Sequence, residues 1–368
     1  RANENVNGFI GLTIGDTGGA EGESQVWGTG TDMTTCIENE PANTADTCTT
    51  SDSIVVDQAY LNFNVGPVNV RAGRQDFSPA GDIFNLVMVE TYDAFNFSAN
   101  AGLADIYGVF IRHSENDMNV GGNDGDDNIY VLGSQFSPNE NVDAGAFVVY
   151  RRDRATKDEI FWLGADGSFK AGPVDISAEA VLLTGERDTG VASSSIDYSG
   201  YAVAVEASAN INQIGFGAVV AYASGDGDNN DNDSEAFMGI DPSFNVTDIY
   251  FDGGDEGNGG AAITGELGGS YVASPYVTVQ PIDQLKLGAR YAFMMFTDNV
   301  TGSGQNQIST EDFIGQEIDL NVNYEIVPQL DIALQAAWFL PDDGVSTVGD
   351  TLSEYMARFT YAFGTGSN

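Results

Sequence analysis

The sequence predicts an all-β protein, a transmembrane antiparallel β-barrel of about sixteen strands, with eighteen as the alternative count. Apolar and polar residues alternate along segments of roughly 10–14 residues, which is the side-chain pattern of a β-strand. The chain contains no run of about 20 apolar residues, which a transmembrane helix would require. Short turns alternate with long loops between the segments, and this order is typical of single-chain outer-membrane barrels.

The C-terminal segment shows the alternation most clearly. Its polar positions include Arg358 and Thr360, and the residues on either side of them are apolar and mostly aromatic. Successive side chains of a strand point to opposite faces, so the pattern predicts one apolar and one mixed face. The apolar set is Tyr355, Ala357, Phe359, Tyr361 and Phe363.

The same pattern recurs along the whole chain, and we expect residues 1–368 to form a single barrel domain. The expected strands are 6–15, 53–65, 68–76, 91–99, 103–113, 127–137, 141–152, 158–170, 173–185, 197–208, 211–224, 263–279, 283–296, 313–326, 329–340 and 351–363.

The connections between these strands fall into a short set and a long set. The short set, expected on the periplasmic side, includes Gly66-Pro67 and Val327-Pro328. The long set is expected on the extracellular side, and loops of this length are usually functional or disordered. Two of these loops, 16–52 and 225–262, are long and acidic.

One of two other long loops is expected to fold into the barrel and set its narrowest point. The candidates are residues 77–90 and residues 114–126. The first of them is unusually apolar for an exposed loop, which suits a packed constriction.

The charge of the chain restricts its partners. The sequence has 13 Lys and Arg against 55 Asp and Glu, a formal net charge of −42. A nucleic-acid partner is excluded on this basis, because phosphate contacts need basic groups. The chain begins at Arg1 without a signal peptide, as expected for a processed form.

The only two cysteines, Cys36 and Cys48, lie in one polar segment. A disulfide between them would stabilise the loop by roughly 3 kcal/mol in an oxidising compartment. Two free thiols are the alternative.

The charged residues on the strands are candidates for the pore lining. Alternation places them on the polar faces, which would line a wet lumen in a wide barrel. Opposed basic and acidic rows would create a transverse field that selects solutes; alternatively, the charges mainly neutralise one another. The basic candidates are Arg71, Arg112, Arg151, Lys286, Arg290 and Arg358, and the acidic ones are Asp57, Asp175, Glu179, Glu206, Glu317 and Asp319.

Arg74 is also a candidate, although simple alternation would point it at lipid. Either a β-bulge at Gly73 turns it inward, which we favour, or it sits at the rim and reaches water.

The loop 225–262 contains a dense group of Asp and Asn residues. Such oxygen ligands on a flexible backbone could bind Ca²⁺ in the acidic loops, although the bidentate Glu of an EF-hand is missing. A solvated acidic loop with a diffuse cloud of cations is the alternative. The candidate ligands are Asp226, Asp228, Asp231 and Asp233. We expect no required cofactor.

We do not expect an enzyme. His113 is the only histidine, and no partner motif for nucleophilic or acid–base catalysis accompanies it. An outer-membrane hydrolase built on a carboxylate pair is kept as a third hypothesis.

Three short segments resemble the alginate-export-like porins. They are residues 70–77 (VRAGRQDF) with 92–95 (YDAF), residues 221–226 (AYASGD) and residues 315–324 (GQEIDLNVNY). The resemblance implies an outer-membrane barrel that passes hydrophilic, often anionic, solutes through an arginine-bearing lumen. It makes Arg71, Arg74 and Glu317 candidate pore residues.

The leading expectation is an integral porin of the bacterial outer membrane, through which ions and small hydrophilic solutes diffuse passively. The alternative is a barrel that anchors calcium-binding acidic loops for contacts with the cell envelope or a surface layer. Under either hypothesis, we expect outer-membrane lipid and lipopolysaccharide to be partners of the protein. We expect the protein to be a monomer or a homotrimer.

Overall fold

The computed structural model describes residues 6–15, 24–27, 35–37, 47–49, 53–81, 83–114, 125–191, 194–227, 231–251, 267–298, 313–342 and 351–361. The regular secondary structure of these residues consists of β-strands alone. Within these ranges, no helix is long and apolar enough to cross a membrane.

Sixteen long strands form the wall, and they correspond one to one with the sixteen predicted strands. The largest difference is at β16, which begins at Ser270 rather than at residue 263 and ends at Ile282 rather than at residue 279. β12 and β13 also differ, because their ladder continues past the region of clear alternation. The long strands are β1 (Val6–Gly15), β5 (Ser53–Val65), β6 (Val68–Phe77), β7 (Glu90–Asn100), β8 (Ala104–Ser114), β9 (Asp127–Asn139), β10 (Val142–Asp153), β11 (Asp158–Ala171), β12 (Val174–Val191), β13 (Ser194–Ile211), β14 (Ile214–Ala223), β16 (Ser270–Ile282), β17 (Leu285–Phe296), β18 (Phe313–Val327), β19 (Leu330–Pro341) and β20 (Leu352–Tyr361).

Four short strands were not predicted. They are β2 (Ser24–Trp27), β3 (Thr35–Ile37), β4 (Thr47–Thr49) and β15 (Asp233–Ser234). β3 and β4 pair with each other, and their register places Cys36 directly opposite Cys48. The disulfide between them stays a prediction that this backbone register permits.

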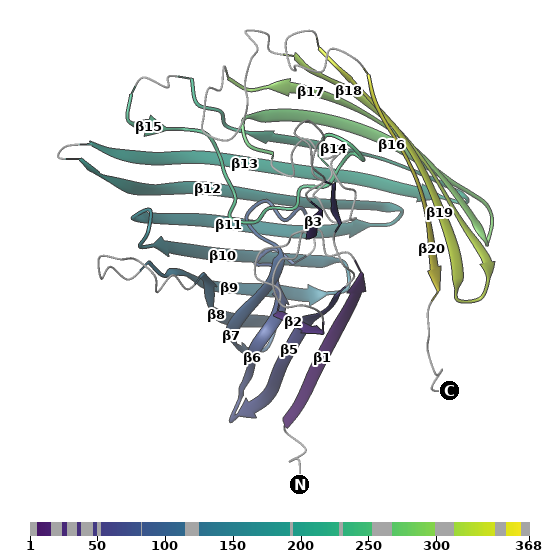
Figure 1. Ribbon diagram of the computed structural model, residues 1–368. Helices are drawn as coiled ribbons and strands as arrows, with labels where there is room; N and C mark the ends of the chain where they lie inside the picture. Colours follow the sequence, from purple (N-terminus) through teal and green to yellow (C-terminus); the bar gives the residue numbers. More distant parts are fainter. Residues whose placement is uncertain are drawn as a thin grey trace.

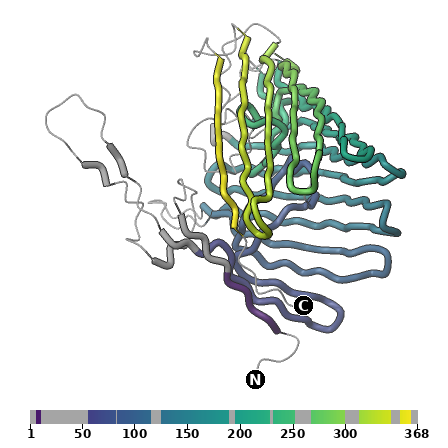
Figure 2. The backbone as a smooth tube through the Cα atoms, turned by 90° about the vertical axis from the view of Figure 1, so that its right-hand side faces the viewer, coloured from purple at the N-terminus to yellow at the C-terminus, as the bar shows by residue number. Residues whose placement is uncertain are grey.

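The other strands join one 18-stranded, strongly curved sheet (Figures 1 and 2). Successive long strands pair antiparallel, β14 pairs directly with β16, and the short β15 runs parallel to β13. The all-β antiparallel barrel fold is therefore confirmed. Among the described residues, β1 and β20 share no hydrogen-bond ladder, so they form the two edges of the sheet.

The two faces of the sheet differ in polarity. On β18, Ile318 and Leu320 are exposed, whereas Glu317 and Asp319 are buried. Side chains alternate along a strand, so the apolar set faces outward and the polar set faces the interior. The interior of the barrel therefore carries most of the charged wall residues.

A row of aromatic rings crosses the outward face toward the end of the barrel that carries the long loops. Phe110, Tyr130, Tyr150 and Phe161 lie side by side on four neighbouring strands, with ring centroids 5.3, 5.9 and 4.5 Å apart. The first pair is tilted, and the other two pairs are stacked. Aromatic girdles of this kind flank the apolar band of outer-membrane barrels, where ring and hydroxyl meet the membrane–water interface.

The buried apolar core lies inside the barrel. It joins inward-facing wall residues to two chain segments that fold into the lumen from the long-loop end. The first inward segment comprises residues 78–81 and 83–89 and connects β6 to β7. The second inward segment comprises residues 235–251 and lies between β15 and β16. The prediction that loop 77–90 folds inward is confirmed; most of 114–126 lies outside the described residues.

Candidate functional site

The two inward segments meet in the lumen and form one constriction. The backbone nitrogen of Val89 donates to the carbonyl of Asp241 at 2.9 Å, and the nitrogen of Ile240 donates to the carbonyl of Val87 at 2.7 Å. The nitrogen of Ser243 donates to the carbonyl of Asn85 at 3.1 Å. These bonds satisfy backbone groups that would otherwise be buried without partners.

Aromatic rings fill the centre of the constriction. The ring centroid of Phe84 in the first segment lies 6.4 Å from that of Phe244 in the second. The Phe244 ring contacts Phe251 edge-on, with the two centroids 5.3 Å apart. Tyr250 packs against Phe339 of β19, with the two ring centroids 5.2 Å apart. Burial of such rings stabilises the packing by roughly 1.5–3 kcal/mol each, so the segments are held as part of the core.

Two buried carboxylates of the wall hold the segments from opposite parts of the sheet. Glu179 on β12 accepts a hydrogen bond from the backbone nitrogen of Leu86 at 3.3 Å. Glu317 on β18 accepts bonds from the nitrogens of Ile249 at 2.6 Å and Tyr250 at 3.0 Å. Charge-assisted bonds of this kind are about twice as strong as neutral ones. Both acids were predicted to line the pore, and both instead contact the constriction.

Further contacts tie the second segment to the wall. Arg290 on β17 donates to the carbonyl of Val246 and to the hydroxyl of Ser274, each at 3.0 Å. The indole nitrogen of Trp162 on β11 donates to the carbonyl of Met238 at 2.8 Å. Asp319, opposite Arg290 in the ladder, is also buried, so it too is covered by the constriction.

A polar cluster joins the segments to β7, β8, β9 and β10. The hydroxyl of Tyr92 donates to Asp241 at 2.6 Å, and His113 lies between Asp127 and Asp241. Arg151 contacts Asp127 at 2.8 Å. Burial raises the pKa of Asp241, but hydrogen bonds from His113 and Tyr92 outweigh it, and the pKa is lowered overall.

The remaining inward-facing candidates lie away from the constriction. The Arg71 guanidinium lies 4.6 Å from the ring centroid of Tyr60, and Glu206 accepts a hydrogen bond from Tyr276. Asp175, Lys286 and Arg358 also fall on the inward face by register. Their role in conduction stays a prediction.

The positions expected for Arg74 and Arg112 are wrong. β6 pairs in continuous register with both neighbours through Gly73, so no bulge turns Arg74 inward. Arg74 lies opposite Asp93, on the face away from Arg71. Arg112 shares the outward face with Phe110, beyond the aromatic row, where it pairs with Asp126.

The register is irregular at Asp57, and its place in the pore lining stays a prediction. β5 pairs Gln58 with Gly11 and Val56 with Leu12, which leaves Asp57 as the extra residue of a β-bulge. Simple alternation therefore does not assign this side chain to the polar face. The bulge that the sequence suggested at Gly73 lies at Asp57 instead.

The acidic loop residues do not converge in the described part of the chain. Asp226 is buried, whereas Asp231 and Asp233 are exposed. Asp231 accepts a hydrogen bond from the backbone nitrogen of Asp233 at 3.0 Å, and Asp228 lies outside the described residues. No three His, Cys, Asp or Glu side chains in the described ranges are arranged to hold a metal ion.

Sequence reasoning missed the second inward segment and the part played by His113. The segment lies inside a loop read as acidic and exposed, yet Phe237, Phe244 and Phe251 are among its buried residues. The signal was present, because several large apolar residues in a surface loop predict a packed role.

The constriction covers only part of the wall. Buried inward-facing residues run from Gln75 and Phe77, at the long-loop end of β6, to Phe339 on β19. On β5, β6 and β20 the inward residues Asn62, Arg71 and Arg358 are half-buried or exposed. The lumen beside β1, β5, β20 and the short-turn part of β6, which carries Arg71, is therefore the uncovered sector.

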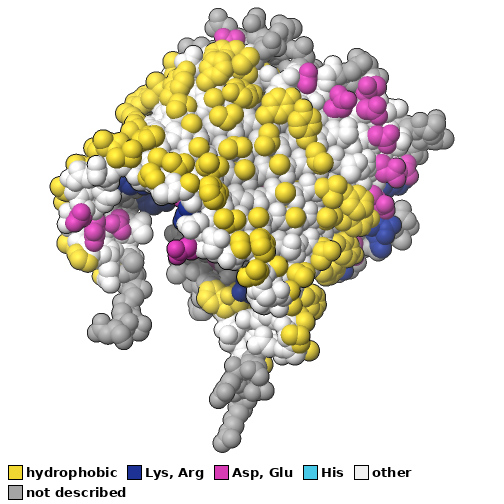
Figure 3. All heavy atoms as spheres, turned by 180° about the vertical axis from the view of Figure 1, so that it is seen from behind, with side chains coloured by type: hydrophobic (Ala, Val, Ile, Leu, Met, Phe, Trp, Pro, Cys, Tyr) yellow, Lys and Arg dark blue, Asp and Glu magenta, His cyan; other side chains and the backbone are white. Residues whose placement is uncertain are grey.

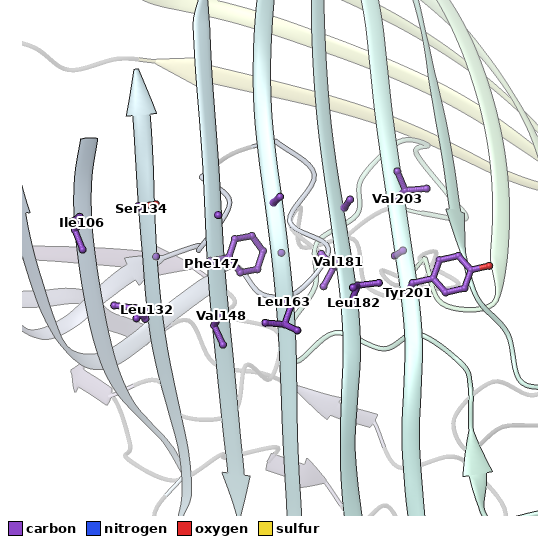
Figure 4. A pocket seen from close by; sticks show the side chains of 16 residues that line it. Ile106, Leu132, Ser134, Phe147, Val148, Leu163, Val181, Leu182, Tyr201 and Val203 are labelled. Atoms are coloured by element: carbon purple, nitrogen blue, oxygen red, sulfur yellow. The ribbon is translucent and has the colours of Figure 1, made fainter. Parts of the chain in front are cut away.

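The outward surface seen in Figure 3 is largely apolar, and acidic side chains gather along its right-hand edge. A shallow hollow of about 780 Å³ crosses β8 to β13 on this face (Figure 4). Small residues lie opposite one another along its floor, and the large side chains of Leu132, Leu163 and Leu182 form one margin. The floor residues are Ser134, Ala146, Ala165 and Ala180.

A family model connects this architecture to known proteins. The model for alginate export matches residues 122–359. The chain belongs to the alginate-export family. Two of the three segments that resemble the family, 221–226 and 315–324, lie inside the matched range, and the first lies outside it. No curated protein matches the chain.

Solved structures share the fold of this alginate-export family member. The outer membrane protein OprD from Pseudomonas aeruginosa is 12% identical over 84% of this chain and 78% of its own, with a TM-score of 0.54. OccK9 (OpdG) from the same organism is 13% identical over 83% and 75%, also with a TM-score of 0.54. OccK5 (OpdH) is 12% identical over 87% and 84%, with a TM-score of 0.53. At these identities the likeness concerns the fold alone.

Proposed function

We propose that this protein is an outer-membrane porin through which ions and small hydrophilic solutes diffuse passively. The observation that carries the proposal is the inverted polarity of the wall. Large apolar side chains such as Leu132, Leu163 and Leu320 are exposed outward, while charged groups face the interior. A sheet with this polarity suits a lipid exterior and a wet interior.

The uncovered sector is the path that we assign to solutes. Arg71 and Arg358 face this sector, and Asn62 lies opposite Arg71 in the ladder. Polar and basic groups along a low-dielectric wall act strongly on passing ions, because water screens them less there than in bulk. The path would be narrow beside the constriction and wider toward the short turns.

Planar-bilayer recording tests the proposal. Purified protein in a membrane under a salt gradient is expected to give discrete current steps, and the reversal potential would report the sign of the favoured ion. Liposome swelling with uncharged sugars of increasing size would then give the size limit of the path. Absence of both current and swelling from protein that migrates as a folded, heat-modifiable band would overturn the proposal.

A further inference from the structure

His113 is the single histidine of the chain, and it lies between the wall and the constriction. Its side chain is 28% exposed. The Nδ1 atom lies 2.8 Å from a carboxylate oxygen of Asp127 on β9. The Nε2 atom lies 3.2 Å from a carboxylate oxygen of Asp241 in the second inward segment. Both ring nitrogens therefore face acceptors.

This geometry determines the proton count of the ring. An ionised carboxylate can only accept hydrogen bonds, so each ring nitrogen needs its own proton to bond to its partner. A neutral imidazole carries one N–H, and only the imidazolium carries two. The arrangement is thus satisfied by the charged ring alone.

We propose that His113 is a pH-responsive latch, which holds the second inward segment to the barrel wall when its imidazole is doubly protonated and releases it when one proton is lost. The effect of release on current rests on the proposed porin function; the latch itself does not.

The contact to Asp241 is the one that we expect to break. Asp127 keeps Arg151, whose Nε and Nη2 atoms lie within 3.1 Å of its carboxylate oxygens. Within this cluster of described residues, Asp241 keeps the side-chain hydrogen bond from the Tyr92 hydroxyl, at 2.6 Å. If the remaining proton stays on Nδ1, the lone pair of Nε2 faces the Asp241 carboxylate and repels it.

The charges around the ring support the direction of the effect. Tyr92 approaches from β7, Asp127 from β9, Arg151 and Asp153 from β10, and Asp241 from the second inward segment. With the imidazolium, these groups carry two positive and three negative charges; without it, they carry one and three. Loss of the proton leaves an excess of negative charge in a partly buried site, which disfavours the closed arrangement.

Asp241 is well placed to pass this change to the constriction. Its carbonyl accepts from the nitrogen of Val89 at 2.9 Å, and its own nitrogen donates to the carbonyl of Val87 at 3.3 Å. Displacement of Asp241 therefore weakens the pairing between the two inward segments. The protonated state binds the constriction more firmly, so the closed form is favoured at low pH and lost as pH rises through the titration of the ring.

Nitrogen-15 NMR of protein labelled at histidine tests the latch without any current. The chain has one imidazole, so the two nitrogen signals belong to His113, and their couplings to the ring protons distinguish Nδ1 from Nε2. We expect both nitrogens to be protonated at neutral pH, with Nε2 losing its proton first as pH rises. A neutral ring with one bare nitrogen at neutral pH would overturn the proposal. Asp241→Asn is expected to shift this titration to lower pH, and an unchanged titration would also overturn it.

Current recordings with matched variants test the consequence. Current through the native protein is expected to rise over the pH range in which His113 loses its proton. His113→Lys keeps a positive charge between the carboxylates and is expected to hold current low throughout this range. His113→Gln has no titrating group and is expected to remove the pH dependence. A native pH profile in H113Q would overturn the gating consequence, whereas silence in every variant would reject the porin function and leave the NMR result to decide the latch.

Discussion

The carboxylate of Glu317, buried in the wall on β18, lies 2.6 Å from the backbone nitrogen of Ile249 in the second inward segment. Its other oxygen accepts from the nitrogen of Tyr250 at 3.0 Å. A wall residue that alternation assigns to the pore lining is thus occupied with binding a loop. The docking of the second inward segment can therefore be tested by substituting single residues of the wall.

Glu317→Gln is expected to loosen the second inward segment. The amide keeps one acceptor oxygen, but its NH₂ group would face the second backbone N–H, which then lacks a partner. An unsatisfied buried donor costs about 1–3 kcal/mol. We expect larger and noisier single-channel currents than in the native protein. Glu325→Gln, on the same strand but exposed, is the matched control and should leave the currents unchanged.

Arg71 and Arg74 offer a paired test of the conducting path. They lie three residues apart on β6 and face opposite sides of the sheet. Arg71→Glu replaces a positive by a negative charge in the uncovered sector, so the reversal potential should shift toward cation selectivity. Arg74→Glu should leave it near the native value. Equal shifts from the two variants would show that the path does not follow this sector.

Gly73 and Gly66 test the backbone of the β5–β6 hairpin. Both have positive φ, 124° and 62° respectively. A Cβ at Gly73 would lie 2.3 Å from the carbonyl oxygen of Ala59, whereas a Cβ at Gly66 would meet nothing within 4 Å. Gly66→Ala should cost about 1–2 kcal/mol from the backbone conformation alone. Gly73→Ala should cost clearly more, measured as the denaturant midpoint for unfolding in detergent.

Protonation of Asp241 at low pH is expected to weaken the docking of the second inward segment. This sets a second limit, on the acidic side, to the pH range in which the constriction is docked. The lowered pKa of Asp241 means that the ionised side chain stabilises the docked form at pH values above the ordinary aspartate pKa. This contribution is lost as pH falls through the lowered pKa of the docked state. Trp162 is the reporter, because its indole donates to Met238 of the same segment. We expect its fluorescence to change on acidification when it is the only tryptophan present.

Asp241→Asn supplies the control for this acid transition. The variant has no carboxylate to protonate, so the transition should disappear or shrink while the fluorescence of the folded protein persists at neutral pH. An acid transition of native size in D241N would assign the change to other groups.

The wall of the barrel was predictable from the sequence, because its information is local. Alternation on β18 or β19 identifies the strand and its faces within a few residues. Local alternation fails where the register carries an extra residue, as at Asp57, and where a charged residue stands beyond the apolar band, as at Arg112. Both positions depend on pairing with a neighbouring strand.

The constriction was predictable only in part. The apolar character of loop 77–90 indicated that it packs inward, and it does so through Leu86 and Met88. Its partner surface is contributed by residues about 150 positions away, as in the backbone hydrogen bond from Val89 to Asp241. The sequence pattern does not say which distant segments contact each other in the fold. The hydrogen bonds by which Glu179 and Glu317 bind the two inward segments could therefore not be predicted from it.

The two edge strands, β1 and β20, have a consequence for how the barrel enters its membrane. Each edge carries backbone N–H and C=O groups without a ladder partner among the described residues. In hydrocarbon each such group costs several kcal/mol, whereas water or a facing strand satisfies it. Transfer of the described wall into lipid is therefore opposed at these two edges until they are joined or wetted. The pairing of β1 and β20 therefore decides when the described wall is fully satisfied in the bilayer.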